Sequence, residues 1–437
     1  MTERHRQFLK RVWASVRHTP TARRDQDVEH LVGSCAALLS QRGEVSMARI
    51  AADAIAAYGR LNEEGRDAFF DALATDYSPN AADLQRAIDA YQIDPSPLRA
   101  HALHQAAEPR RQELFRRLNT AVGGTQLLVR LRADLLPTLP DHAERAGIDA
   151  DLAHLLRSWF NRGFLVLQRI DWHTSATVLE RLIAYEAVHQ IQGWDDLRRR
   201  LAADRRCYAF FHPALRDEPL IFIEVALTRR LAGDVQSLLD PRAAMTDPSE
   251  ARWAMFYSIT NCQAGLKGIS FGNFLIKQVV EDLSREFVRI RKFATLSPIP
   301  GFRSWLSSAR DLMSPELAAA DIGDADQLRT LPSPLSEEIR RLCAYYLVRE
   351  KRERAPLNSV ARFHLANGAR LARLNWMGDA SPAGIASSLG LTANYVYRIA
   401  EVETNHEAYA TSFDVARSFS VERLAREVKG PKHAVPA

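Results

Sequence analysis

A serine and a histidine far apart in the chain have side chains that could each take part in chemistry. Ser297 lies in "KFATLSPIPGFRSWL", directly before Pro298 and shortly before Pro300. A proline fixes its own φ and holds the preceding residue extended, so this backbone is stiff. His364 lies farther along, in "RFHLANGA". An imidazole with a pKa near 6.5 can deliver a proton at neutral pH, while a hydroxyl can hold a ligand oxygen.

Each of these residues also has a simpler structural explanation. Ser297 and Pro298 can merely cap a strand, and His364 can bond a backbone carbonyl inside a helical bundle. Glu224 interrupts an apolar run, "LIFIEVAL", and a buried carboxylate needs a partner, so it pairs with an arginine or faces the site. Other histidines that could act as a base are His189, His212 and His406.

A glycine-rich loop could bind an anion. "NCQAGLKGISFGNF" (261–274) carries Gly265, Gly268 and Gly272, with Lys267 among them. Glycines let a backbone approach a ligand closely, and the free N–H groups at a helix start attract phosphate. The spacing is neither that of a P-loop nor that of a GxGxxG dinucleotide loop. A phosphate-binding loop and a turn shaped only by packing both remain open.

The elements that must position these residues divide the chain in two. Residues 1–165 place apolar side chains at three- and four-residue spacing, as in "EHLVGSCAALLS", which predicts a helical bundle. Residues 166–437 contain short apolar runs that predict buried strands, and helices return from about residue 334. The expected strands are 207–211, 220–227, 254–259 and 293–296. A helix over 272–287 joins the last two strands into a βαβ unit.

Composition excludes several classes of protein. The 437 residues are 46% hydrophobic and 25% charged, which is typical of a globular protein of two or three domains. No apolar run approaches the roughly 20 residues of a membrane span, and no signal peptide is evident, so we expect a cytoplasmic protein. The 4 cysteines and 13 histidines lack the spacing of a metal site. A net charge of +5 permits an anionic partner without demanding one.

Several long segments carry a family resemblance. The strand, glycine loop and helix look like the acyl-CoA site of the GNAT acetyltransferase fold, although the loop is longer than that superfamily's Q/R-x-x-G-x-G/A. The run from "SITNCQAGLKGISFGNFLIK" to "FATLSPIPGFRSWL" instead resembles malonyl-CoA decarboxylase, which uses this fold for another reaction. Further matching segments are "RRCYAFFHPALRDEPLIFIEVALT", "LNSVARFHLANGARLARLNWMGDAS" and "GLTANYVYRIAEVETNHEAY".

The resemblance implies a fold, a reaction and a site. The fold is an all-helical amino-terminal domain that self-associates into a dimer or tetramer, followed by a GNAT-like mixed-sheet domain with helical additions. The reaction converts malonyl-CoA to acetyl-CoA and CO₂ through a thioester enolate protonated by His364, with Ser297 as its hydrogen-bonded partner. No metal or prosthetic group is implied, since the thioester itself accepts the electrons. The residues expected to bind malonyl-CoA besides this pair are Lys267, Gly268, Ile269, Ser270, Phe271, Gly272 and Asn273, and those expected to line the pocket are Asn375, Asn394 and Tyr397.

Two other functions fit parts of the sequence. One is an acyltransferase on the same fold, which would move an acyl group from CoA to an amine. The other is DNA binding, because residues 381–403 have the spacing of a helix-turn-helix with Gly390 at the turn. The second of these helices would offer Arg398 as its one basic group, whereas DNA binding needs several. We therefore expect no nucleic-acid partner and a helix pair that covers the acyl site.

Overall fold

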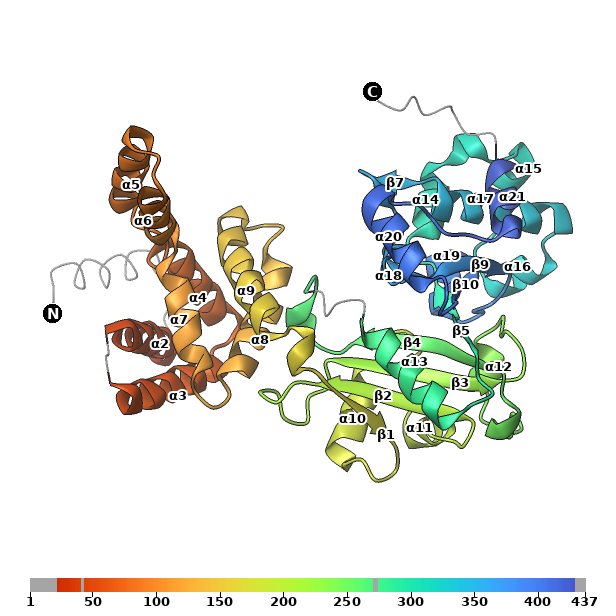
Figure 1. Ribbon diagram of the computed structural model, residues 1–437, viewed down its shortest axis with the longest axis horizontal. Helices are drawn as coiled ribbons and strands as arrows, with labels where there is room; N and C mark the ends of the chain where they lie inside the picture. The colour runs from red at the N-terminus through yellow and green to blue at the C-terminus, as the bar shows by residue number, and fades with distance from the viewer. Residues whose placement is uncertain (1–21, 41–42, 270–273, 429–437) are drawn as a thin grey trace. The chain divides into compact units, whose positions relative to one another are not determined.

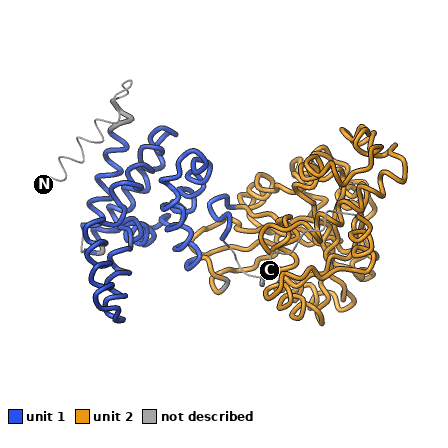
Figure 2. Tube along the Cα trace, turned by 90° about the horizontal axis from the view of Figure 1, so that it is seen from above, with its two compact units in different colours: residues 1–159, 263–269 blue, residues 160–262, 270–437 orange. Residues whose placement is uncertain are grey.

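The computed structural model describes residues 22–40, 43–269 and 274–428, which form two compact units (Figures 1 and 2). The first unit comprises the residues up to Trp159 together with Gln263–Ile269; the second comprises Phe160–Cys262 and the described residues from 274 onward. The domain boundary at residues 165 and 166 stays a prediction, and the compact units divide slightly earlier. None of the helices in the described ranges is both long and apolar enough to cross a membrane.

The first unit is a bundle of helices. Its described α-helices are α2 (Ala22–Ser40), α3 (Glu44–Arg60), α4 (Glu63–Thr75), α5 (Ala81–Ile93), α6 (Pro97–Ala107), α7 (Arg110–Asn119), α8 (Gly124–Leu135) and α9 (Ala146–Trp159). Asparagine side chains start two of them, since Asn62 accepts the Gly65 amide and Asn80 accepts the Ala82 amide. The 3₁₀ turns are η1 (Leu136–Thr138), η2 (Ala143–Arg145) and η5 (Ala264–Leu266), the last lying in the glycine loop.

The second unit is built on a mixed sheet of eight strands. They are β1 (Val166–Ile170), β2 (Arg205–Phe211), β3 (Ile221–Thr228), β4 (Trp253–Asn261), β5 (Lys292–Thr295), β6 (Ser297–Pro298), β9 (Arg370–Asn375) and β10 (Thr392–Tyr397). The order is β1-β2-β3-β4-β5-β10-β6, with β9 also paired to β10. Strands β4 and β5 run parallel, and the other neighbours run antiparallel. A separate hairpin consists of β7 (Lys351–Arg352) and β8 (Ala355–Pro356).

Helices cover both faces of this sheet. Helix α13 (Phe274–Glu286) crosses from β4 to its parallel neighbour β5 (Figure 1), so the expected βαβ unit is present. It lies on the face that carries Tyr208, whose hydroxyl donates to Asp282 (2.9 Å). Helices α10 (Ala176–Tyr185) and α11 (Trp194–Arg200) cover the opposite face, where Leu182 and Leu197 pack with Phe222.

The rest of the second unit consists mainly of helices. Its helices are α12 (Gln236–Leu239), α14 (Phe302–Ser308), α15 (Pro315–Ala319), α16 (Ala325–Thr330), α17 (Ser333–Val348), α18 (Ser359–Ala366), α19 (Pro382–Ser388), α20 (Val402–Ser412) and α21 (Phe419–Arg426); the 3₁₀ turns of the second unit are η3 (Arg162–Phe164), η4 (Pro248–Glu250) and η6 (Arg310–Leu312). The helix pair expected over residues 381–403 is wrong, because α19 is followed by strand β10. The run "TANYVY" is rich in aromatic and β-branched residues, which favour a strand with packed neighbours on both sides. The predicted fold class, a helical region followed by a mixed-sheet domain with helices, is confirmed.

Candidate active site

Strand β10 fixes the position of Ser297. Its carboxyl end pairs with β5 (Tyr397 opposite Phe293), and its amino end pairs with β6 (Ala393 opposite Ser297). Between the two pairings, Leu296 instead donates its amide to the carbonyl of Phe256 in β4 (2.8 Å). Ser297 therefore comes directly after the last residue of this segment that pairs with β4. Its side chain is buried. Strand β6 is at the edge of the sheet, where the missing N–H of a proline does no harm.

Helix α18 brings His364 to this serine. The Nε2 atom of His364 is 2.9 Å from Ser297 Oγ, and its Nδ1 atom is 2.8 Å from the hydroxyl of Tyr397. The imidazole also stacks on Tyr395, with ring centroids 4.6 Å apart and an interplanar angle of 28°. The side chain is 3% exposed, and burial lowers the pKa of His364 to about 3. The ring is therefore neutral at pH 7. The lowered pKa differs from the ordinary imidazole pKa that was assumed from the sequence.

The hydrogen bonds around His364 form a continuous chain. Ser297 Oγ donates to Thr295 Oγ1 (2.8 Å), which also accepts the Tyr395 amide (3.2 Å). If Ser297 donates to Thr295, the neutral imidazole donates from Nε2 to Ser297 and accepts the Tyr397 hydroxyl at Nδ1. Burial raises the pKa of Tyr397, so that hydroxyl stays protonated and can donate. The imidazole and the serine hydroxyl are thus held in one orientation by Thr295, Tyr395 and Tyr397.

Asn358, which the sequence did not single out, connects residues 297–300 (the serine loop) to α18, which carries His364 (the histidine helix). Its Oδ1 accepts the Ala361 amide as the N-cap of α18, while its Nδ2 donates to the carbonyl of Pro300 (both 2.8 Å). The hydroxyl of Tyr346 donates to the same carbonyl (3.1 Å). An asparagine before a helix signals a cap, but its second contact depends on tertiary structure.

The glycine loop is described as far as Ile269 and belongs to the helical unit. Lys267 and Gly268 are exposed, whereas Gly265 and Ile269 are buried. A Cβ atom on Gly265 would lie 1.8 Å from the carbonyl oxygen of Val129, so packing alone requires this glycine. Gly268 has a φ of +77°, where glycine is favoured. The predicted ligand-binding residues Ser270, Phe271, Gly272 and Asn273 lie outside the described residues.

Comparison with known families places this geometry in context. A family model described as the malonyl-CoA decarboxylase C-terminal domain matches residues 163–435. A model described as the N-terminal domain of the same enzyme matches residues 77–160. The chain belongs to the malonyl-CoA decarboxylase family. The family resemblance noted in the sequence is thereby confirmed, and the sheet with its buried Ser297–His364 contact lies within the C-terminal match.

Relatives of known identity cover much of the chain. The mitochondrial malonyl-CoA decarboxylase of Anser anser anser is 39% identical over 337 residues, which are 69% of this chain and 66% of that protein. The mitochondrial enzyme of Rattus norvegicus is 35% identical over 361 residues, 74% of this chain and 73% of that protein. The crystal structure of malonyl-CoA decarboxylase from Rhodopseudomonas palustris matches with a TM-score of 0.85 and 47% identity, covering 91% of this chain and 99% of that chain. The structure from Agrobacterium vitis gives 0.83 and 49%, with the same coverage.

The three expected pocket residues of this malonyl-CoA decarboxylase family member have different surroundings. Tyr397 reaches the imidazole, as described above. Asn394 is fully buried and donates to the carbonyls of Thr295 (2.8 Å) and Ala232 (3.1 Å), while accepting from Arg373 (3.0 Å) and Asn375 (3.0 Å). Its amide group has no capacity left for a ligand. Asn394 therefore supports the backbone of Thr295, and Asn375 supports Asn394.

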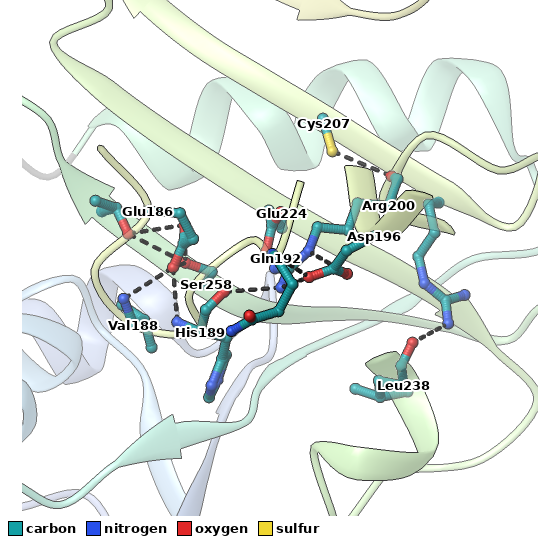
Figure 3. Close-up of polar contacts among 12 residues, drawn as sticks. Glu186, Val188, His189, Gln192, Asp196, Arg200, Cys207, Glu224, Leu238 and Ser258 are labelled. Carbon is teal, nitrogen blue, oxygen red and sulfur yellow. Dashed lines mark hydrogen bonds and ion pairs between the residues drawn. The ribbon is translucent and has the colours of Figure 1, made fainter. Parts of the chain in front are cut away.

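Glu224 lies with Arg200 in a separate buried cluster (Figure 3). Its carboxylate accepts from Arg200 (2.6 Å), and Arg200 also donates to Asp196 (3.1 Å). Burial raises the pKa of Glu224 to about 8. Nearby, the carboxylate of Glu186 accepts from the hydroxyl of Ser258 (2.8 Å). Of the two alternatives for Glu224, the structure shows the pairing with arginine.

The remaining histidines have structural surroundings. His212 packs on Phe160, with ring centroids 4.6 Å apart, and His406 lies 2.7 Å from the carbonyl of Ala366 through Nδ1. The backbone of His189 accepts from Arg200 and donates to Glu186. Across residues 22–40, 43–269 and 274–428, no three histidine, cysteine, aspartate or glutamate side chains gather closely enough to hold a metal ion.

Proposed function

We propose that this chain decarboxylates malonyl-CoA to acetyl-CoA and CO₂, with Ser297 and His364 acting on the acyl group. The observation that carries the proposal is the buried contact of 2.9 Å between Ser297 Oγ and His364 Nε2, in a chain of the malonyl-CoA decarboxylase family. Ser297 and His364 are far apart in the sequence, and they meet just after the segment that carries Ser297 stops pairing with β4. Such a juxtaposition of a hydroxyl and an imidazole is suited to holding an acyl group and moving one proton.

The reaction breaks one carbon–carbon bond and consumes one proton. The bond between the α-carbon and the carboxylate carbon of the malonyl group breaks, CO₂ leaves, and the electron pair passes into the thioester as an enolate. The enolate oxygen needs a hydrogen-bond donor, and the α-carbon needs a proton. When substrate binds, the Ser297 hydroxyl turns from Thr295 and donates to a thioester or carboxylate oxygen, while still accepting from His364 Nε2. His364 supplies the proton, which yields the methyl group of acetyl-CoA.

His364 takes up a proton from solvent as the substrate binds. In the free protein burial holds the pKa of His364 near 3, so the imidazole is neutral. The malonyl carboxylate brings a negative charge beside the ring, which favours the imidazolium. The hydroxyls of Ser297 and Tyr397 can each accept from an imidazolium N–H, so the existing contacts fit both protonation states.

The remainder of the substrate is CoA, which we assign to the glycine loop. Its diphosphate would meet backbone N–H groups and the Lys267 ammonium in the segment from Lys267 to Asn273. Supporting this, Lys267 and Gly268 are exposed in the part of the loop that is described.

We also infer self-association and a cytoplasmic location. Large apolar side chains of the helical unit are exposed at Val45 (87%), Ile93 (85%), Leu98 (77%) and Val122 (99%), which favours a second copy as partner. The four cysteines are free and buried, as is typical of a reducing compartment. Light scattering on the purified chain and cell fractionation test these two inferences.

The test of the reaction is CO₂ release from malonyl-CoA without any acceptor. Ser297→Ala and His364→Asn should each slow release at least about a hundredfold, the usual scale for a lost proton-transfer group, while CoA still binds. Calorimetric titration with CoA checks that binding. Acyl transfer to an amine without CO₂ release by the unmodified protein would instead favour the acyltransferase.

A further inference from the structure

An arginine of the helical bundle holds the described part of the glycine loop. Arg132, on α8, donates from one guanidinium nitrogen to the carbonyl of Gly265 (2.7 Å) and to that of Lys267 (2.8 Å). Its Nε donates to Asp149 (2.7 Å), and this contact fixes the orientation of the guanidinium group. The arginine side chain is 5% exposed. These are charge-assisted hydrogen bonds, which are stronger than those between neutral groups.

Close packing against the same helix strengthens this attachment. Gly265 lies so near to α8 that a Cβ atom would reach within 1.8 Å of the Val129 carbonyl oxygen. Leu266 and Ile269 are buried on either side of the exposed Lys267 and Gly268. The loop is thus attached at its carbonyls and apolar side chains, and its ammonium group remains exposed.

The carbonyl contacts also set the direction of an amide. In a trans peptide the C=O and the following N–H point in opposite directions. Because the Lys267 carbonyl points to Arg132, the Gly268 N–H points away from α8. Among the described residues this N–H has no acceptor, and the space around the Gly268 Cα is open. It is therefore available to an anion.

We propose that Arg132 is a positioning residue for the CoA diphosphate, acting through the loop without contacting the ligand. The inference rests on the proposed function, because it assumes that the loop binds CoA. Without the guanidinium, the carbonyls of Gly265 and Lys267 lose their donor, and the Gly268 amide loses its fixed direction.

The test is calorimetric titration of the full chain with CoA, together with steady-state decarboxylation kinetics. Arg132→Gln should weaken CoA binding at least about tenfold, the scale of one lost hydrogen bond to a charged group. The KM for malonyl-CoA should rise by a similar factor, while kcat changes less than about threefold, since Ser297 and His364 are untouched. A purely structural role would lower thermal stability without this separation of KM from kcat.

Arg111→Gln is the matched control. Arg111 is equally buried in the same bundle, pairs with Asp151 (2.5 Å) and reaches a backbone carbonyl, that of Leu73, but has no contact with the loop. Its replacement should cost similar stability and leave CoA affinity within about twofold. Unchanged CoA affinity in Arg132→Gln, or equal weakening in both variants, would overturn the proposal.

Two further measurements keep the outcome unambiguous. If Arg132→Gln does not fold, Arg132→Lys keeps the charge but not the planar fork, and should weaken CoA binding by about threefold. Unchanged affinity in a folded Arg132→Lys would then count against the proposal. Because the titration needs no turnover, an unmodified protein that binds CoA without releasing CO₂ refutes the proposed reaction while leaving the role of Arg132 testable.

Discussion

Replacing Asn358 by serine should separate the positioning of His364 from the folding of its helix. Serine is as good an N-cap as asparagine, so α18 keeps its first hydrogen bond. The shorter side chain has no amide to donate to the Pro300 carbonyl, which is the link between the serine loop and the histidine helix. That carbonyl retains the hydroxyl of Tyr346 as a donor, so no buried acceptor is left without a partner.

The expected effects on stability and rate differ in size. One lost hydrogen bond of this kind costs about 1 kcal/mol in the free energy of unfolding. For catalysis, a displacement of about 1 Å between reacting groups can cost about a hundredfold. Since two of the contacts of His364, those with Tyr397 and Tyr395, remain, we expect kcat to fall by about 10- to 100-fold.

The assay is CO₂ release at saturating malonyl-CoA, with CoA affinity and urea denaturation measured on the same preparations. Asn62→Ser is the control, because Asn62 caps α4 in the helical unit and accepts the Gly65 amide. It should lower stability by less than about 1 kcal/mol and leave kcat unchanged. A kcat for Asn358→Ser within twofold of the unmodified protein would show that this asparagine does not position the histidine.

Two further predictions concern stability. Gly265→Ala should destabilise the chain by about 3 kcal/mol or more, because a Cβ 1.8 Å from the Val129 carbonyl oxygen forces the backbone to move; Gly33→Ala, in open space on α2, should be neutral or stabilise by up to about 1 kcal/mol in the same urea titration. The raised pKa of Glu224, about 8 against an unfolded value near 4.5, means that the folded state binds more protons between these values. Its contribution is thus present at low pH and lost as pH rises toward 8, with a slope of at most about 1.4 kcal/mol per pH unit. Glu224→Gln should therefore flatten the stability profile between pH 5 and 8, and an unchanged slope would contradict the assignment.

Local sequence patterns were sufficient to predict half of the strands of the sheet. The runs expected at 207–211, 220–227, 254–259 and 293–296 correspond to β2, β3, β4 and β5, and the helix expected over 272–287 is α13. Each is a continuous apolar stretch or an amphipathic one, so its own residues carry the signal. Strand β10 was missed, because the glycine before it and the helical α19 imitate a helix-turn-helix.

The site was harder to predict, because its contacts join distant parts of the chain. Ser297 and His364 were paired through family resemblance, since neither residue's neighbours indicate the other. The second contact of Asn358 and the assignment of Gly265 to the helical unit depend on packing between segments far apart in the sequence. Such contacts leave no local pattern to detect.

The place of β10 has a consequence for how the protein is made. The serine-bearing strand takes its neighbour from residues that emerge from the ribosome almost a hundred positions later, as the register of Ser297 with Ala393 requires. With Ser297 in its proposed role, a nascent chain that has already folded its bundle and first four strands would still be inactive. Activity would therefore appear late in synthesis, and a premature stop before Thr392 would yield a partly folded product that is unable to turn over substrate.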